Sequence, residues 1–257
     1  MKTALCTIAF KELSIEAVLD LASEAGFDGV EPWGRPPHIP HPYNGECMRK
    51  IAESVQARGL VVSQYGSYAN PLSSEFAQEM EDALRAATDL ETDTIRVWAG
   101  RTGSEDASDE DWVSAIDGLQ VFADRAAGAG VRLVLEMHNG YLSDSADGSL
   151  RLVAGVDREN FRLNYQPNYA HKADRVMAEA ERAAPYVAAV HAQNYLNPGS
   201  NERSLVSGGF VDYTAVLELL RRVGFDGFLE VEFVRKEAPN EALKADADYL
   251  RSLCGSG

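Results

Sequence analysis

The sequence of 257 residues contains little of what disulfide-rich or zinc-thiolate proteins depend on. Its three cysteines, Cys6, Cys47 and Cys254, are far apart and form no Cys-x-x-Cys pair, so neither a disulfide framework nor a Cys-built zinc site is predicted. No apolar stretch approaches the roughly 18 residues of a membrane-spanning helix. The N-terminal run MKTALCTIAF lacks a following small-residue cleavage site, so we expect a first strand rather than a signal peptide. These absences predict a cytoplasmic protein with no membrane partner.

Positive charge is also scarce. The chain has 24 Lys and Arg against 40 Asp and Glu, which gives a formal net charge of −16. A chain this acidic repels phosphate backbones, so we expect no nucleic-acid partner. Neither a Gly-x-Gly-x-x-Gly motif nor a P-loop follows the first predicted strand, which argues against an open nucleotide-binding sheet. The expected partner is a small molecule, and the oligomeric state, including a homo-oligomer, is left open.

The sequence does have a regular alternation of strand-like and helix-like segments. Ser14 is the expected N-cap of one helix-like segment, which ends at Gly26. A second helix-like segment, VDYTAVLELLRRVG (211–224), is amphipathic and ends at Gly224. Alternating units of this kind require parallel strands and right-handed crossovers. Eight units in this length predict one α/β domain over residues 1–257, a (β/α)8 TIM barrel. The expected strands cover 3–10, 29–33, 60–68, 94–100, 131–140, 161–168, 187–194 and 227–234.

The last four expected strands share one pattern. Residues two apart share a face of a strand, and each of these strands has apolar residues on one face and polar residues on the other, near its C-terminal end. In a barrel of this type the C-terminal strand ends carry the site. Burying several polar groups there without a shared partner would cost several kcal/mol. Two carboxylates, an imidazole and an amide oxygen suit a divalent cation such as Mn²⁺, Mg²⁺ or Co²⁺. The predicted metal ligands are Glu136, Gln166, His191 and Glu232.

Several motifs resemble those of the sugar phosphate isomerase/epimerase family. They are EMHNG (136–140), the His-x-Gln-Asn segment at 191–194, the Arg203…Gly209-Phe210-Val211-Asp212 segment and GFLEVEF (227–233), with GVEPW (29–33) and TIRVWAG (94–100) fitting the same pattern. The family consists of xylose-isomerase-like TIM barrels and includes ketose 3-epimerases, hydroxypyruvate isomerase and inosose or dehydroshikimate dehydratases. The resemblance implies one divalent metal held by residues of strands five to eight, which fall here on the four predicted ligands.

The sequence departs from the family at the sixth strand. Family members commonly have Asp-Pro-x-His after this strand, whereas this chain has Gln166-Pro167-Asn168-Tyr169. A neutral amide oxygen can still coordinate a cation, but the site loses one negative charge. We therefore expect weaker metal binding. The family's substrate-binding His at this segment is absent too.

Further candidates surround the predicted centre. His138 shares a strand face with Glu136 and could relay a proton. Arg203 resembles the family's substrate-contacting Arg, and Gln193 follows the ligand His191 on the same strand. The aromatic side chains of Trp33 and Trp98 could form an apolar wall that stacks on a sugar. The predicted substrate-binding residues are Trp33, Trp98, Gln193 and Arg203.

The predicted site suggests its own chemistry. A divalent cation would draw charge onto the carbonyl oxygen of a hydroxyketone while a carboxylate, Glu136 or Glu232, takes the neighbouring proton. If the other carboxylate returns a proton, the result is isomerisation or epimerisation of an unphosphorylated sugar, which is the leading hypothesis. If it protonates a departing β-oxygen, the enzyme is a dehydratase or lyase on a keto-sugar, keto-inositol or 3-keto-glycoside.

Two rival classes remain at this stage. An apurinic endonuclease of the same barrel type needs several His-rich zinc sites and a basic DNA face, and five His at net charge −16 offer neither. A catalytically silent sugar-binding barrel is kept open by the neutral Gln166. Proton exchange from solvent deuterium into ketoses separates a working enzyme from a silent barrel.

Overall fold

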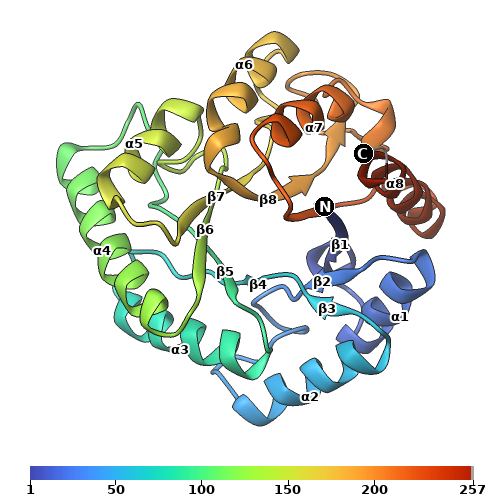
Figure 1. Ribbon diagram of the computed structural model, residues 1–257, viewed down its shortest axis with the longest axis horizontal. Helices are drawn as coiled ribbons and strands as arrows, with labels where there is room; N and C mark the ends of the chain where they lie inside the picture. Colours follow the sequence, from blue (N-terminus) through green and yellow to red (C-terminus); the bar gives the residue numbers. More distant parts are fainter. Residues whose placement is uncertain (256–257) are drawn as a thin grey trace.

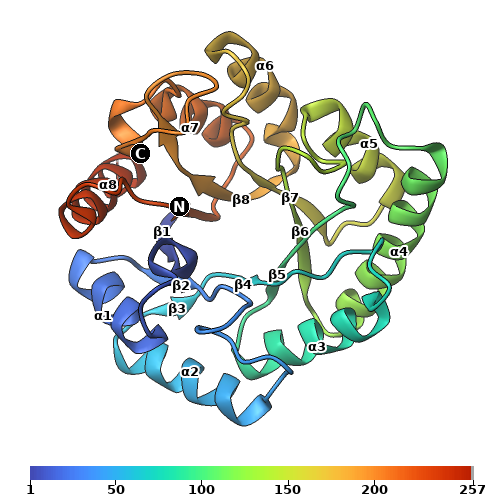
Figure 2. The same ribbon diagram turned by 180° about the vertical axis from the view of Figure 1, so that it is seen from behind.

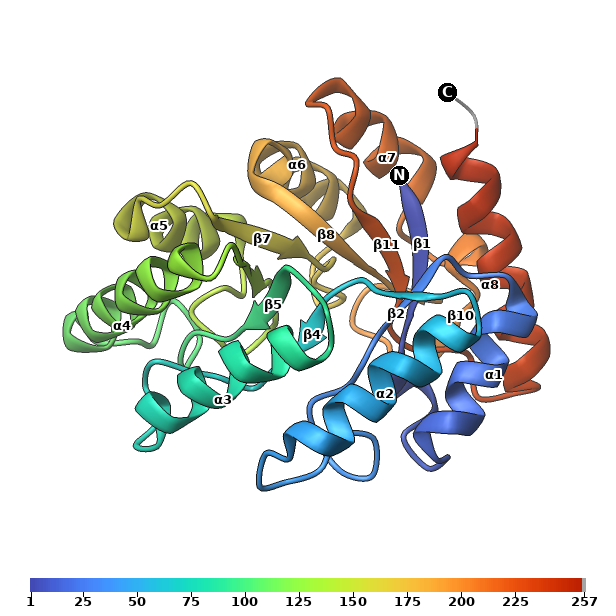
Figure 3. The ribbon, with the colours of Figure 1, turned by 60° about the horizontal axis from the view of Figure 1, so that its bottom comes forward.

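Parallel strands form a nearly closed ring at the centre of the molecule, and helices surround them (Figure 1; Figure 2 from behind). Residues 1–255 contain eight α-helices. The computed structural model describes residues 1–255. The strand order is β3-β2-β1-β11-β8-β7-β6-β5-β4, and every neighbouring pair is parallel. Figure 3 shows β1, β8 and β11 side by side with their arrowheads at the same end. The predicted (β/α)8 TIM barrel is confirmed.

The elements alternate along the chain as the sequence indicates. The barrel strands are β1 (Lys2–Cys6), β2 (Gly29–Glu31), β3 (Val61–Val62), β4 (Tyr65–Gly66), β5 (Thr94–Val97), β6 (Arg132–Glu136), β7 (Phe161–Tyr165), β8 (Val187–Ala192) and β11 (Phe228–Val231). The helices are α1 (Ile15–Ala25), α2 (Gly45–Ala57), α3 (Phe76–Asp89), α4 (Asp109–Gly128), α5 (Ala146–Val156), α6 (Ala173–Ala183), α7 (Tyr213–Arg222) and α8 (Pro239–Cys254). A small antiparallel pair, β9 (Asn194–Tyr195) and β10 (Arg203–Ser204), lies in the loop after β8. Within residues 1–255, no helix has the length and apolar character needed to cross a membrane.

The third barrel strand is split in two. The sequence predicts one continuous strand over 60–68, but β3 pairs with β2 while β4 pairs with β5. Ser63 and Gln64 lie between the two halves, where the barrel closes. The prediction of an unbroken strand is therefore wrong. At this break the buried Gln64 side chain donates to the carboxylates of Glu31 and Glu230 in the barrel interior.

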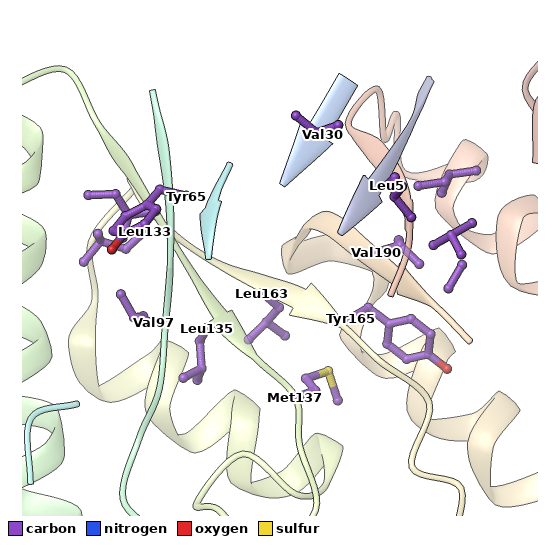
Figure 4. Close-up of a cluster of buried hydrophobic side chains, with 14 of the residues drawn as sticks. Leu5, Val30, Tyr65, Val97, Leu133, Leu135, Met137, Leu163, Tyr165 and Val190 are labelled. Carbon is purple, nitrogen blue, oxygen red and sulfur yellow. The ribbon is translucent and has the colours of Figure 1, made fainter. Parts of the chain in front are cut away.

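The apolar core lies between the strands and the helix ring. Figure 4 shows members of this cluster, among them Leu133, Leu135 and Leu163, along neighbouring strands. These residues alternate with the inward-facing polar ones, as the period of a strand requires. Helix ends are fixed by the expected caps: the Ser14 hydroxyl accepts from the Ala17 N–H, and Gly26 ends α1 with φ 78°.

Helix α8 fastens the long loop after β8 through a buried carboxyl group. Asp246 is 1 % exposed, and its Oδ1 accepts the Val206 backbone N–H at 2.7 Å. Its other oxygen has no hydrogen-bond partner among the described residues. Burial raises the pKa of Asp246 to about 6, from an ordinary value of 3.8.

Replacing Asp246 with Asn should therefore change the pH dependence of stability. The pKa of Asp246 is higher in the folded than in the unfolded protein. At low pH the carboxyl is protonated in both states and its ionisation does not affect stability. As pH rises from about 4 to about 6, its ionisation increasingly destabilises the folded protein. The free energy of unfolding of Asp246→Asn relative to wild type should rise by up to about 3 kcal/mol over that range. Denaturant unfolding at a series of pH values measures it. Asp248→Asn, which removes an exposed carboxylate from the same helix, is the control. A pH-independent difference would refute the assignment.

Candidate metal centre

The four predicted metal ligands meet at one end of the barrel. Glu136 ends β6, Gln166 follows β7, His191 lies in β8 and Glu232 follows β11, and all four side chains are buried. His191 Nδ1 lies 3.7 Å from Glu136 Oε1, 3.7 Å from Glu232 Oε1 and 3.3 Å from Gln166 Oε1. Ligand atoms of Glu136, His191 and Glu232 all lie within 4.8 Å of one another. One cation with metal–ligand distances of about 2.0–2.3 Å can bridge such a group.

The amide of Gln166 fits a cation in one orientation and the carboxylates in the other. With its oxygen toward the cluster, the amide presents a third oxygen beside those of Glu136 and Glu232, which is a donor set for a hard divalent cation. With the amide turned by 180°, its nitrogen donates to Glu232 Oε2 at 2.8 Å and to Glu136 Oε1 at 3.3 Å. The residues present therefore fit a divalent metal, and Gln166 can satisfy both carboxylates when it does not coordinate.

A second group of buried residues supports the ligands from behind. His191 Nε2 lies 2.7 Å from Glu31 Oε2, so the imidazole can donate to Glu31 while Nδ1 faces the ligand cluster. Gln64 Nε2 donates to Glu230 Oε2 at 2.5 Å and to Glu31 Oε2 at 3.2 Å. Arg96 Nη1 lies 2.8 Å from Glu136 Oε2 and 3.4 Å from Glu31 Oε1. These contacts fix the tautomer of His191 and the orientation of Glu136.

The centre carries an excess of negative charge. Four buried carboxylates, of Glu31, Glu136, Glu230 and Glu232, lie around the guanidinium of Arg96 and the imidazole of His191. Burial raises the pKa of Glu232 to about 7, and the negative charge of Glu136 adds to the effect. Burial would also raise the pKa of Glu136, but the Arg96 guanidinium holds it below its usual value. A divalent cation would offset the surplus charge.

Changing Gln166 to Asp should tighten metal binding. A full negative charge would replace an amide dipole beside the cation, so we expect Mn²⁺ affinity to increase by about tenfold or more. Calorimetric titration of Mn²⁺ into both proteins measures the change. Asn168→Asp adds the same charge two residues further along, at a half-buried position, and controls for general electrostatics. Equal or weaker affinity in the Gln166→Asp protein would mean that residue 166 is not a ligand.

An aromatic group stands at the mouth of the centre. The Trp98 ring stacks on Tyr68 with centroids 5.6 Å apart, and it lies 5.2 Å from the His138 ring and 4.5 Å from the Tyr141 ring. His138 Nδ1 lies 2.8 Å from the Asn139 carbonyl oxygen, which leaves Nε2 as the lone-pair nitrogen. No hydrogen bond to Nε2 occurs within residues 1–255. Trp98 thus lies beside both His138 and Arg96, and Arg96 contacts Glu136, whereas the roles of Trp98 and His138 toward a substrate stay predictions.

The other predicted substrate-binding residues divide into two groups. Gln193 and Arg203 join the centre, because Gln193 Nε2 donates to Glu232 Oε2 at 2.6 Å and Arg203 Nη2 donates to Gln193 Oε1 at 3.4 Å. Trp33 contacts the aromatic group instead, because its indole N–H donates to the Tyr68 hydroxyl at 2.7 Å. Trp33 therefore supports the aromatic group, and its contact with a substrate stays a prediction.

The sequence did not identify four residues that the structure places in this centre. Glu31, Glu230, Arg96 and Gln64 are not among the predicted site residues. The alternation of side chains along a strand could have identified two of them. Glu230 lies two residues before the predicted ligand Glu232, so both side chains lie on the same face of the strand. Arg96 and Trp98 have the same relation, and both reach the site.

A family model described as a xylose isomerase-like TIM barrel matches residues 19–253. The chain belongs to this family. One similar curated protein is the 3-dehydroshikimate dehydratase of Bacillus anthracis, 26 % identical over 170 residues, which cover 64 % of this chain and 61 % of that protein. The aligned part of the chain thus spans less than two thirds of that relative.

Solved structures of the family share the fold. D-psicose 3-epimerase of Clostridium cellulolyticum H10, solved with D-tagatose, has a TM-score of 0.78 at 18 % identity, covering 98 % of this chain and 99 % of that one. A xylose isomerase-like TIM barrel protein of Mycobacterium smegmatis, solved in complex with magnesium, has a TM-score of 0.78 at 16 % identity, covering 98 % and 96 %. The family thus contains epimerases and a dehydratase, and at least one member binds a divalent metal.

Proposed function

We propose that the protein is a metal-dependent enzyme that removes a proton next to the carbonyl group of a small hydroxyketone, as an isomerase or epimerase of an unphosphorylated carbohydrate. The observation that carries the proposal is the convergence of Glu136, Gln166, His191 and Glu232 on one buried point. These four would hold the divalent metal, Mn²⁺, Mg²⁺ or Co²⁺. When bound, such a metal acts as a Lewis acid that stabilises negative charge on a carbonyl oxygen.

The chain supplies the proton transfers. Glu136 and Glu232 come from different strands and can stand on opposite sides of a bound substrate. One takes the proton next to the carbonyl, and the other returns a proton to the opposite face or to the next carbon. The Arg96 contact holds Glu136 and the Gln193 contact holds Glu232, so each carboxylate has a fixed orientation. Trp98 and Tyr68 provide an apolar wall at the entrance.

A second candidate, a dehydratase or lyase, is favoured by the placement of His138. Its free Nε2 lone pair lies at the entrance, outside the ligand set, so it offers an additional base. With a base and two carboxylates, the site could remove a proton and protonate a departing β-oxygen. The similarity to a 3-dehydroshikimate dehydratase supports the same outcome.

One experiment tests both candidates. The protein is incubated with Mg²⁺ or Mn²⁺ in deuterium oxide together with ketoses and keto-inositols, then quenched with chelator and analysed by mass spectrometry and chromatography. Isomerisation gives a new isomer carrying deuterium, whereas elimination gives a product that has lost water. If no compound exchanges its α-proton in the presence of either metal, the proposed function is wrong for these substrate classes.

A further inference from the structure

A cavity of about 370 Å³ lies at the entrance, beside the aromatic wall of the candidate centre. Its lining includes Tyr68, Trp98 and Tyr141 together with two arginines, Arg35 from the loop after β2 and Arg101 from the loop after β5. Both loops follow the C-terminal ends of barrel strands, where this fold binds its ligands. No carboxylate of residues 1–255 lies within 4.0 Å of either guanidinium, so both charges are available to a ligand.

The aromatic side chains join this cavity to the candidate metal centre. On the cavity side, the Arg35 guanidinium lies 3.9 Å from the centre of the Tyr68 ring. On the other side, the Arg96 guanidinium lies 5.4 Å from the Tyr68 ring and 5.2 Å from the Trp98 ring, and it contacts Glu136.

Tyr141 links the same two regions. Burial raises the pKa of Tyr141, the positive charges of Arg101 and Arg35 lower it, and the negative charge of Glu136 raises it. These groups therefore act on one hydroxyl. Tyr141 also lines the cavity, and its ring lies 4.5 Å from the Trp98 ring and 5.3 Å from the His138 ring, so the cavity adjoins the side chains around Glu136.

We propose that Arg35 and Arg101 form a subsite for a carboxylate group carried by the substrate. The proposal rests on the proposed function for the rest of the molecule, and it narrows the substrate class to acidic hydroxyketones such as keto-sugar acids. A planar carboxylate matches the fork of a guanidinium, and the flat aromatic lining suits the adjoining carbon frame.

A monoanion fits this subsite better than a phosphate ester. Phosphate groups are usually held by several backbone N–H donors or a helix N-terminus in addition to side chains. The chain also has a net charge of −16, which disfavours a dianion more than a monoanion.

Binding of a matched set of probes tests the subsite. D-fructose, D-fructuronate and D-fructose 6-phosphate differ only in the group at the far end of one carbon chain, and each is titrated into the Mg²⁺-loaded full chain by calorimetry. Two exposed charge-assisted contacts should make D-fructuronate bind about tenfold more tightly than D-fructose at low salt. Arg35→Gln and Arg101→Gln should each reduce this preference, and the double variant should remove it. Affinity for D-fructose and for Mg²⁺ should stay unchanged.

Arg132→Gln is the matched control, because Arg132 is an exposed arginine at the start of β6, at the opposite end of the barrel. It should leave the preference intact. The subsite is overturned if D-fructuronate binds no better than D-fructose at millimolar concentrations, or if the preference survives in the double variant. Stronger binding of D-fructose 6-phosphate, lost in the double variant, would overturn the carboxylate assignment in favour of a phosphate. Absence of α-proton exchange with an intact preference for D-fructuronate would instead refute the proposed function and leave the subsite standing.

Discussion

Replacing either Glu136 or Glu232 with Gln is expected to lower turnover by about 10²–10⁴-fold, the usual effect of losing a general base or acid. Gln keeps an oxygen that can bind a cation, but it cannot accept the substrate proton. Exchange of the substrate α-proton with deuterium measures the loss directly, once a turning-over ketose has been identified. Glu218→Gln removes an exposed carboxylate from α7 and should leave turnover unchanged.

The two variants should differ in how well they keep the metal. Glu232 accepts from the amide of Gln193, whose oxygen in turn accepts from the Tyr195 hydroxyl at 2.9 Å and from Arg203 Nη2 at 3.4 Å. This amide can turn its oxygen toward the nitrogen that Glu232→Gln introduces, at the cost of the long Arg203 contact, because a hydroxyl can either donate or accept. Glu136 instead faces Arg96, which has no acceptor, so the amide introduced by Glu136→Gln must aim its oxygen at the guanidinium or suffer a donor–donor contact. We therefore expect Glu136→Gln to lose more Mn²⁺ affinity than Glu232→Gln. If both variants exchange the α-proton at the wild-type rate, another residue is the base, and His138 is the next candidate.

The fold could be predicted from the sequence because strand and helix periods alternate along the whole chain. The runs 131–140, 161–168, 187–194 and 227–234 contain β6, β7, β8 and β11, and their apolar faces form the core against the helices as expected. The split of the third strand could not be predicted. Residues 60–68 contain no proline and no charged residue that would indicate an interruption, and the break depends on where the ring closes between β2 and β5.

The candidate site could be predicted in part. Ligand residues near strand ends are visible in a sequence, because the C-terminal ends of parallel strands meet at one edge. The residues that orient the ligands cannot be recognised in the same way. In a sequence, a Glu on the inward face of a strand has the same pattern whether it binds a cation or orients a histidine. Glu31 and Glu230 belong to the latter kind, through their contacts with His191 and Gln64. They also retain negative charge near position 166, where the neutral Gln166 reduces the charge of the ligand set.

Arg96→Met is expected to destabilise the protein by about 3–5 kcal/mol, the range for removing one partner of a buried ion pair. Arg96 is 1 % exposed, and its loss would leave the buried carboxylates of Glu31 and Glu136 with His191 as their remaining partner among the positive groups described above. For a chain of this length the melting temperature should fall by roughly 10 °C. Arg158→Met breaks an exposed ion pair with Asp124 and should cost less than about 1 kcal/mol.

A double variant distinguishes loss of charge from loss of packing. If the buried carboxylates are the cause, adding Glu136→Gln to Arg96→Met should recover part of the stability, so the two effects will be less than additive. Mn²⁺ should also raise the melting temperature of Arg96→Met more than that of wild type, because the uncompensated carboxylates bind the cation more tightly and binding to the folded state stabilises it. Additive effects together with equal metal-induced shifts would show that Arg96 acts through its packing against Tyr68 and Trp98, and that the ion pair with Glu136 contributes little.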